Sequence, residues 1–242
     1  SETLEPEMLS RYLNEYLTPM TERVMSDGGL LDKYIGDAIM AVYGAPLEMT
    51  DHASRACATA LAMHRDLRPL NESWRARGLP EIAIGIGVNS GPMAVGNMGS
   101  EARFDYTVMG DAVNLGARLE ALTKEYGVDI LTGEATAQSA TGFVFRELDL
   151  VRVAGRQGTA RVFELVGRDG DGPLSATQLA VFAGALEAYR LRDWPAAEAG
   201  FSTFLDQVPA DGPAHVMRDR VRTLRHSPPP ADWDGVYAQV TK

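Results

Sequence analysis

The chain has 242 residues, of which 45% are hydrophobic and 23% are charged, with 33 acidic against 23 basic side chains and a net charge of −10. This composition fits a globular protein of one or two domains and argues against binding to nucleic acid or to an anionic membrane surface. The single cysteine, Cys57, cannot form an intrachain disulfide and fits a reducing compartment. No apolar run reaches the ~18 residues of a membrane helix, and no signal peptide is recognisable, so we expect a cytoplasmic setting.

The first two thirds of the chain predict a mixture of helices and strands. Helical spacing of apolar residues and strand-like runs between turn residues predict the elements in chain order. The first are a helix at 4–25, a hairpin within 31–44, a helix at 51–77, a strand at 81–89, a turn and a short strand within 90–100, and a strand at 103–109. A helix at 112–126 that Gly127 ends, a strand at 128–132, a short helix at 133–140 and a hairpin at 143–153 and 159–166 follow. This order predicts an α+β domain with a mixed sheet.

The first hairpin carries two charged residues in the stretch LDKYIGDAIMAVYG, residues 31–44. Two apolar runs meet at Gly36 and Asp37, and glycine at the first central position suits a type II′ turn. Lys33 stands four residues before Asp37. On this stretch alone, turn chemistry explains Asp37 better than a ligand site does.

The composition changes at residues 167–175, which are rich in glycine and aspartate and predict a linker. Residues 176–208 predict two amphipathic helices separated at 193–195, with one unit close to the tetratricopeptide pattern. A further helix at 213–225 would complete a TPR-like segment over 176–226. We expect the proline-rich end, 227–242, to be extended.

Three segments of the first 166 residues have the order and spacing of one enzyme family. They are KYIGDAIMAVYG at 33–44, GIGVNSGPMAVGNMGSEARFDYT at 85–107 and VMGDAVNLGARLE at 108–120. Together they resemble the catalytic domain of the class III adenylate and guanylate cyclases, which has a ferredoxin-like α+β fold. The C-terminal part looks like that of bacterial cyclases with a membrane-anchored sensor domain upstream. The loop GIGVNSG lacks the G-x-G-x-x-G spacing of a dinucleotide site.

The resemblance implies roles for the two charges of the hairpin. Cyclisation of a nucleoside triphosphate is an intramolecular attack of the ribose 3′-oxygen on the α-phosphorus, with pyrophosphate as the leaving group. Two Mg²⁺ or Mn²⁺ ions about 4 Å apart can assist it, and such ions prefer carboxylate ligands. Asp37 matches a metal ligand of the family. Lys33 matches the residue that reads the purine, where lysine accompanies adenine and glutamate accompanies guanine.

Three further positions match residues of the family that contact the substrate. Thr107, three residues before Gly110, matches the second base-reading position, and its hydroxyl can accept from the adenine amino group. Asn114 and Arg118 share a helix face at i, i+4 spacing and match the pair that orients the ribose and neutralises charge on the transferring phosphate. Taken alone, Thr107 reads as an ordinary strand residue and Arg118 as a surface residue.

The sequence also departs from the family. Relatives begin the domain with a strand F-x-D-I-x-x-F-T that carries another metal aspartate, whereas this sequence opens with SETLEPEMLSRYLNEYL, which matches the segment just after it. We expect that the natural protein has this strand and that the present sequence is truncated. Where relatives often have V-K-G-K with a lysine for the triphosphate, this chain has Ala154 and Arg156, and Arg156 is the candidate to replace that lysine.

The resemblance therefore implies an adenylate cyclase that converts ATP to 3′,5′-cyclic AMP and pyrophosphate. The family works as head-to-tail dimers with sites at the interface, which implies a homodimer with two equivalent sites. Lys33, Thr107, Asn114 and Arg118 would come from one protomer and Asp37 from the other. The alternatives are guanylate cyclase activity, a catalytically inactive nucleotide-binding or regulatory module, and a tetratricopeptide scaffold that explains only the C-terminal part.

Overall fold

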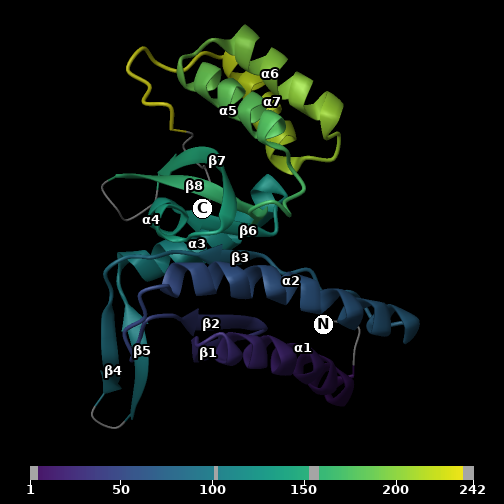
Figure 1. Cartoon of the computed structure of the whole chain (residues 1–242), viewed down its shortest axis with the longest axis vertical. Helices are drawn as coiled ribbons and strands as arrows, with labels where there is room; N and C mark the ends of the chain where they lie inside the picture. The colour runs from purple at the N-terminus through teal and green to yellow at the C-terminus, as the bar shows by residue number, and fades with distance from the viewer. Residues whose placement is uncertain (1–4, 101–102, 153–157, 237–242) are drawn as a thin grey trace. The chain divides into compact units, whose positions relative to one another are not determined.

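A computed structural model of the chain describes residues 5–100, 103–152 and 158–236, with the side chain of Arg103 left out (Figure 1). The chain divides into two compact units. Residues 1–84 and 91–113 form the first unit, and residues 85–90 and 114–242 form the second. Each unit is an assembly of helices and strands with its own packing. The α+β class with a mixed sheet, expected from the sequence, is confirmed.

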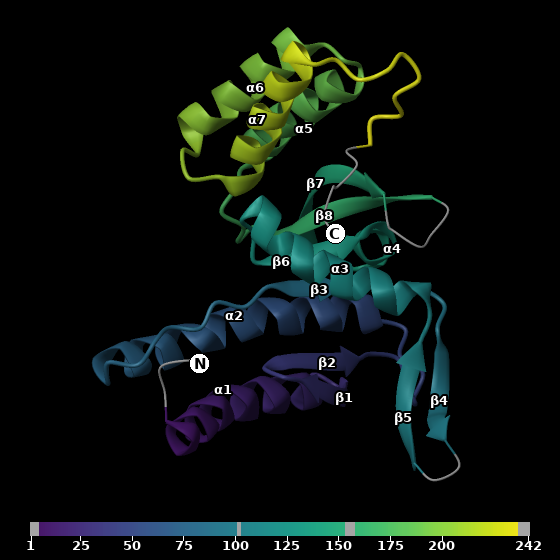
Figure 2. The same ribbon diagram turned by 180° about the vertical axis from the view of Figure 1, so that it is seen from behind.

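The first unit contains two long helices beside a hairpin. Helix α1 spans Pro6–Ser26 and helix α2 spans His52–Ala76. The hairpin consists of β1, Leu30–Ile35, and β2, Ala38–Val42, and a ribbon is formed by β4, Ala94–Ser100, and β5, Arg103–Met109. Figures 1 and 2 show α1 and α2 side by side, with the β1–β2 hairpin next to α1.

Helix α1 packs on α2 through a stripe with a spacing of four residues. Its buried residues are Tyr12, Tyr16, Met20 and Val24. The ring of Tyr12 lies 4.8 Å from that of Trp74, and the Trp74 indole donates to Glu15 at 2.9 Å. Cys57 on α2 is fully buried. The helical spacing therefore identified both helices because the buried face repeats once per turn.

The second unit contains a four-stranded sheet in the order β3-β6-β8-β7. Strand β3, Ile86–Val88, pairs parallel with β6, Ile130–Gly133, whereas β8, Thr159–Arg168, pairs antiparallel with β6 and with β7, Phe143–Arg152. Helix α3, Asp111–Tyr126, precedes β6, and the short α4, Glu134–Ser139, follows it. Helix α3 ends at Gly127, as predicted, because glycine adopts the positive φ of 65° found there.

The strand expected over residues 81–89 is the one clear error among the predicted elements, since β3 covers only Ile86–Val88. The side chain of Asn71 explains the difference. It donates to the carbonyl of Ile82 and accepts from the Ile82 N–H, both at 2.9 Å. The backbone groups of Ile82 are thus bonded to a side chain of α2 and not to a neighbouring strand.

Three helices complete the second unit: α5, Ala176–Arg190, α6, Trp194–Gln207, and α7, Gly212–His226. The helices α5 and α6 form a hairpin at the predicted break, where Asp193 caps α6 by accepting from the Ala196 N–H. Phe182 of α5 stacks edge-on against Phe201 and Phe204 of α6. Whether these helices act as a tetratricopeptide unit stays a prediction.

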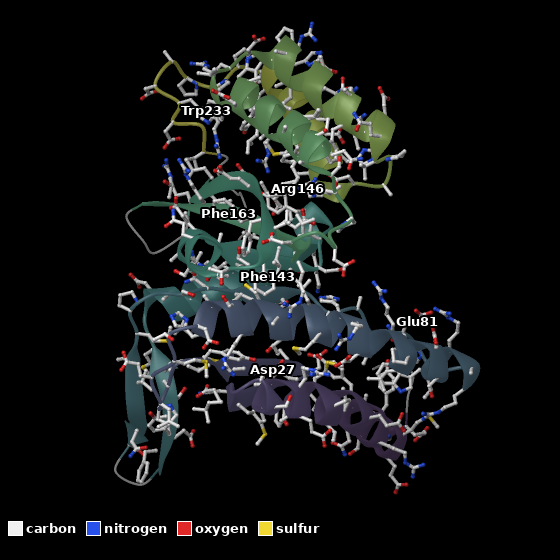
Figure 3. All side chains as sticks on the ribbon, viewed as in Figure 1. Asp27, Glu81, Phe143, Arg146, Phe163 and Trp233 are labelled. Atoms are coloured by element: carbon white, nitrogen blue, oxygen red, sulfur yellow. The ribbon has the colours of Figure 1, made fainter. Side chains whose placement is uncertain are left out.

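The helices share one hydrophobic core with the strands and α3 of this unit. The cluster includes Leu119 of α3, Leu148 of β7, Phe182 of α5 and Met217 of α7. The guanidinium of Arg146, labelled in Figure 3, lies 4.6 Å from the centre of the Phe182 ring. The predicted linker at 167–175 thus joins segments that are buried together, and the prediction of a separate TPR-like segment requires an experimental test.

Within the described residues, no helix is long and apolar enough to cross a membrane.

Candidate functional site

The turn of the β1–β2 hairpin places Asp37 at an exposed tip. Ile35 pairs with Ala38, which leaves Gly36 and Asp37 as the two turn residues. Gly36 has a φ of +64°, and Arg192 is the one described non-glycine residue with a positive φ, so Asp37 has a negative φ. This pattern is the type II′ turn expected from the sequence.

The end of the hairpin is held against α1. The hydroxyls of Tyr34 and Thr21 are 2.8 Å apart, in hydrogen-bonding distance. Burial, together with the negative charge of Asp37, raises the pKa of Tyr16 on α1 to about 12. The Asp37 carboxylate is therefore close to a packed helix while remaining open to solvent.

The described residues fit a two-ion metal site only in part. Asp37 offers exposed carboxylate oxygens of the kind that Mg²⁺ prefers. Across residues 5–100, 103–152 and 158–236, however, no group of three or more His, Cys, Asp or Glu side chains could hold an ion. Among these residues, Asp37 is thus a candidate ligand that belongs to no such group.

Lys33 and Thr107 meet at a third residue that sequence reasoning missed, Asp32. The Thr107 hydroxyl donates to Asp32 Oδ2 at 3.0 Å, and the Lys33 ammonium lies 3.3 Å from the same oxygen. Thr107 comes from β5 and is 6% exposed, while the Asp32 side chain is 1% exposed. One buried carboxylate therefore joins the two residues proposed to read the base.

A signal for Asp32 is present in the sequence. A strand of the form LLDKYI carries two successive charged residues in an otherwise apolar run. Strict alternation would point one of them into the packed face, where a charge needs a partner. The partner, Thr107, lies 75 positions away along the chain, which is why local reasoning did not find it.

Lys33 forms its ion pair with a different aspartate from the one that the i, i+4 spacing suggests. The i, i+4 spacing places Asp37 across the turn, but the ion pair of Lys33 is with Asp32. This agrees with the prediction that Lys33 and Asp37 do not serve each other.

Asn114 and Arg118 lie on α3 in the second unit. Leu115, Leu119 and Leu122 form the buried side of this helix, Asn114 is exposed, and Arg118 is half-buried on the flank. The two residues therefore share the flank that the i, i+4 spacing predicted.

The backbone of α3 is fixed by a very close contact with β3. A Cβ atom at Gly87 would lie 2.2 Å from the Gly116 carbonyl oxygen and 2.4 Å from the Glu120 nitrogen. No side chain fits in this space, so the glycines of GIGVNSG serve close strand–helix packing, in agreement with the rejection of a dinucleotide loop. The packing fixes which flank of α3 carries Asn114 and Arg118.

Arg156, the candidate for the triphosphate, lies outside the described residues.

Comparisons with known proteins agree with the family suggested by the motifs. The family described as "Adenylate and Guanylate cyclase catalytic domain" matches residues 1–167. Adenylate cyclase 1 of Rhizobium meliloti is 37% identical over 168 residues, covering 69% of this chain and 25% of that protein. An adenylate cyclase of Anabaena cylindrica is 37% identical over 175 residues, covering 68% of this chain and 34% of that protein. The chain thus spans about a quarter to a third of the length of these relatives.

Solved structures of an adenylyl cyclase and of a guanylyl cyclase resemble the chain equally well. The adenylyl cyclase CyaB from P. aeruginosa aligns with a TM-score of 0.64 at 31% identity, over 70% of this chain and 88% of that one. The guanylyl cyclase Cya2 aligns with a TM-score of 0.62 at 32% identity, over 72% of this chain and 88% of that one. Overall similarity therefore does not separate adenine from guanine, and the base must be argued from individual residues.

Proposed function

Because the chain belongs to the adenylate and guanylate cyclase catalytic domain family, we propose that it is an adenylate cyclase, converting ATP to 3′,5′-cyclic AMP and pyrophosphate. The observation that carries the choice of ATP is the convergence of Lys33 and Thr107 on Asp32. A lysine ammonium can only donate, and a threonine hydroxyl that donates to a carboxylate keeps its lone pairs for accepting. Adenine offers the matching pair, an acceptor at N1 and a donor at its 6-amino group.

Asn114 and Arg118 would serve the phosphoryl transfer. Attack of the ribose 3′-oxygen on the α-phosphorus forms the new P–O bond, and the bond to pyrophosphate breaks. The asparagine amide would orient the ribose, and the permanent charge and forked donors of arginine would stabilise the charge that develops on the phosphate oxygens. Arg156 is the proposed additional contact to the triphosphate.

We further propose that Asp37 contributes one ligand to a divalent ion, Mg²⁺ or Mn²⁺, and that the active form is a homodimer. A bound divalent ion screens phosphate charge and lowers the pKa of a coordinated oxygen. In a dimer with shared sites, Asp37 of one protomer would serve the nucleotide held by Lys33, Thr107, Asn114 and Arg118 of the other. The exposed position of Asp37 in a two-residue turn supports this role.

The test is a direct assay of cyclic nucleotide formation from ATP and from GTP with Mg²⁺ or Mn²⁺, followed by chromatography of the products. It uses the chain and also a version that includes any residues encoded before Ser1. We expect cyclic AMP as the main product and a loss of about 100-fold or more for Asp37→Ala, because hard cations depend on carboxylate ligands. Removal of the ions with a chelator should abolish turnover.

A matched control for Asp37→Ala is Asp169→Ala, which changes an exposed aspartate in another turn, after β8. Full activity of Asp37→Ala would contradict the metal role of this residue. Cyclic GMP as the main product would contradict the choice of ATP. Absence of any cyclic product in both versions of the chain would favour the inactive regulatory module, for which the incomplete metal ligand set is the supporting observation.

A further inference from the structure

We infer that Asp32 is the residue that determines the preference for adenine over guanine, by fixing the hydrogen-bond direction of Thr107 and the position of Lys33. This inference rests on the proposed function, because it concerns the same nucleotide. Asp32 is a positioning residue in this account, since it acts through its two neighbours and not on the nucleotide.

A bulge in β1 makes the arrangement possible. Leu31 pairs with Ala41 and Lys33 pairs with Met40, so that Asp32 is an extra residue without a partner on β2. A bulge interrupts the alternation of side chains and re-aims those beside it. Asp32 and Lys33 are consecutive in the chain, yet the Lys33 ammonium reaches the Asp32 carboxylate at 3.3 Å.

The carboxylate of Asp32 is buried and only partly satisfied. Its Oδ2 accepts from Thr107, whereas its Oδ1 is shielded from solvent and has no hydrogen-bond partner in the part of the chain that the structure describes. Burial of a charged carboxylate is unfavourable unless a cation or donors compensate it. The Lys33 ammonium, whose side chain is 42% exposed, is the cation beside it. The Thr107 hydroxyl and the Lys33 ammonium therefore both contact the same oxygen, Oδ2 of Asp32.

The direction of the Thr107 hydrogen bond follows from the chemistry of the partners. An ionised carboxylate accepts and does not donate, so the single hydroxyl proton of Thr107 points at Asp32. The remaining lone pairs of the Thr107 oxygen can then only accept. Without Asp32, the same hydroxyl could rotate and donate, so a threonine alone does not distinguish an amino group from a carbonyl.

The two purines differ at the atoms that these residues would meet. Adenine presents an acceptor at N1 and a donor at the 6-amino group, which match a donating Lys33 and an accepting Thr107. Guanine presents a donor at N1 and an acceptor at O6, so both positions would bring like groups together. An unsatisfied buried polar group costs about 1–3 kcal/mol, which makes the fixed direction of one hydroxyl sufficient for a large preference.

The experiment measures the ratio of ATP to GTP, both as dissociation constants from calorimetry and as kcat/KM. The key variant is Asp32→Asn, which keeps the size of the side chain but replaces the pure acceptor by an amide that can donate or accept. We expect the ratio of ATP to GTP in kcat/KM to fall by about 10-fold or more, the effect of losing one buried polar contact that distinguishes the two bases. Much of this change should come from a higher kcat/KM for GTP.

Two Thr107 variants test whether Asp32 acts through the hydroxyl. Thr107→Val should lower the ATP preference by a similar factor. Adding Asp32→Asn to it should change the ratio clearly less than Asp32→Asn does in the unaltered chain, because coupled residues are not additive and only the contact of Asp32 with Lys33 is left to lose. Thr107→Ser keeps the hydroxyl and should keep the preference. If Asp32→Asn fails to fold, an unchanged ATP preference in Thr107→Val overturns the inference, because Asp32 would then have no hydroxyl to act through.

The chain offers a matched control in the same unit. Thr59 Oγ1 donates to Asp27 Oδ2 at 2.9 Å, the same type of pair, and Asp27 is labelled in Figure 3. Asp27→Asn should leave the ATP to GTP ratio unchanged even if it lowers the unfolding temperature. This separates a general loss of stability from a change in base preference.

Each result bears on the inference separately from the function. If the unaltered chain forms cyclic AMP but Asp32→Asn lowers ATP and GTP use equally, the inference is wrong and the function stands. If the chain forms no cyclic product but binds ATP in preference to GTP, and Asp32→Asn removes that preference, the inference stands and the function is wrong. Absence of binding to either nucleotide would overturn both.

Discussion

A buried charged residue, Asp149, lies where three elements of the second unit meet. Asp149 of β7 is 1% exposed and accepts hydrogen bonds from Arg220 of α7 and from the hydroxyl of Tyr126 on α3. Burial by itself would lower the pKa of the Arg220 guanidinium, but the charge of Asp149 raises it above its usual range. Burial and the Asp149 charge likewise raise the pKa of Tyr126. Three elements distant in the sequence are thus connected by one carboxylate.

Arg220→Met should lower the free energy of unfolding by about 3–5 kcal/mol, because it leaves the Asp149 carboxylate buried without a cation. Chemical denaturation followed by circular dichroism measures the change. The double variant Arg220→Met with Asp149→Asn should recover part of the loss, since no uncompensated charge remains.

The control for this change is Arg222→Met on the same helix, where the arginine is exposed and pairs with Glu198 at 2.8 Å. Exposed ion pairs contribute about 0–1 kcal/mol, so this variant should be close to the unaltered chain. Equal effects of the two substitutions would show that the buried position of Arg220 has no special importance.

At the scale of elements, the β1–β2 hairpin carries most of the proposed chemistry of the first unit. Its turn presents Asp37, and its bulge brings Asp32 and Lys33 to one place. Both features depend on backbone geometry that departs from a regular strand. The hairpin is therefore sensitive to substitutions that change the backbone without removing any functional side chain.

Gly36→Ala should lower the free energy of unfolding by about 1–2 kcal/mol, because an L-residue is strained in the left-handed region. Space is not the reason, since no atom lies within 4 Å of a Cβ built at Gly36. We expect cyclase activity to fall together with stability, because the strain acts on the turn that holds Asp37. Thermal unfolding and the product assay measure the two effects.

Gly184→Ala in α5 is the matched control, since a Cβ at this position also meets nothing within 4 Å but the residue is helical. It should raise the free energy of unfolding by about 0.5–1 kcal/mol, the usual gain from replacing glycine in a helix. Opposite signs for the two substitutions would attribute the difference to backbone conformation. Two changes of the same sign would contradict the account of the turn.

At the scale of the whole molecule, the question is whether helices α5–α7 fold independently of the family domain. The core cluster of the second unit runs from α3 and the strands into these helices. Arg146 of β7 pairs with Glu164 of β8 at 2.5 Å and with Asp211, the cap of α7, at 2.9 Å. These contacts join the helices to the sheet through buried apolar and charged groups.

Deletion of residues 176–242 should therefore destabilise what remains, by about 3 kcal/mol or more, because Asp149 loses its cation and Arg146 loses Asp211. Solubility and thermal unfolding of the truncated and whole chains measure the effect. An unchanged unfolding temperature would show an independent helical segment, as the composition change at 167–175 predicted.

Local sequence patterns predicted most elements, because their causes act within a few residues. Helical spacing identified α1 and α2, Gly36 and Asp37 identified the hairpin turn, and Gly127 marked the end of α3. The family followed from three motifs in order. The roles of Lys33, Asp37, Thr107, Asn114, Arg118 and Arg156 stay predictions, which the experiments above test.

Local patterns and the order of three motifs were enough to predict the fold class, the family and the residue types offered for nucleotide chemistry. The tertiary structure decided the features that depend on distant partners: the short β3, whose backbone at Ile82 bonds to Asn71, and the pairing of Asp32 with Thr107. It also decided the common core of the strands with α5–α7. The physical reason is that periodicity and turn chemistry are local, whereas the cost of a buried charge is compensated by whichever group the folded chain brings beside it.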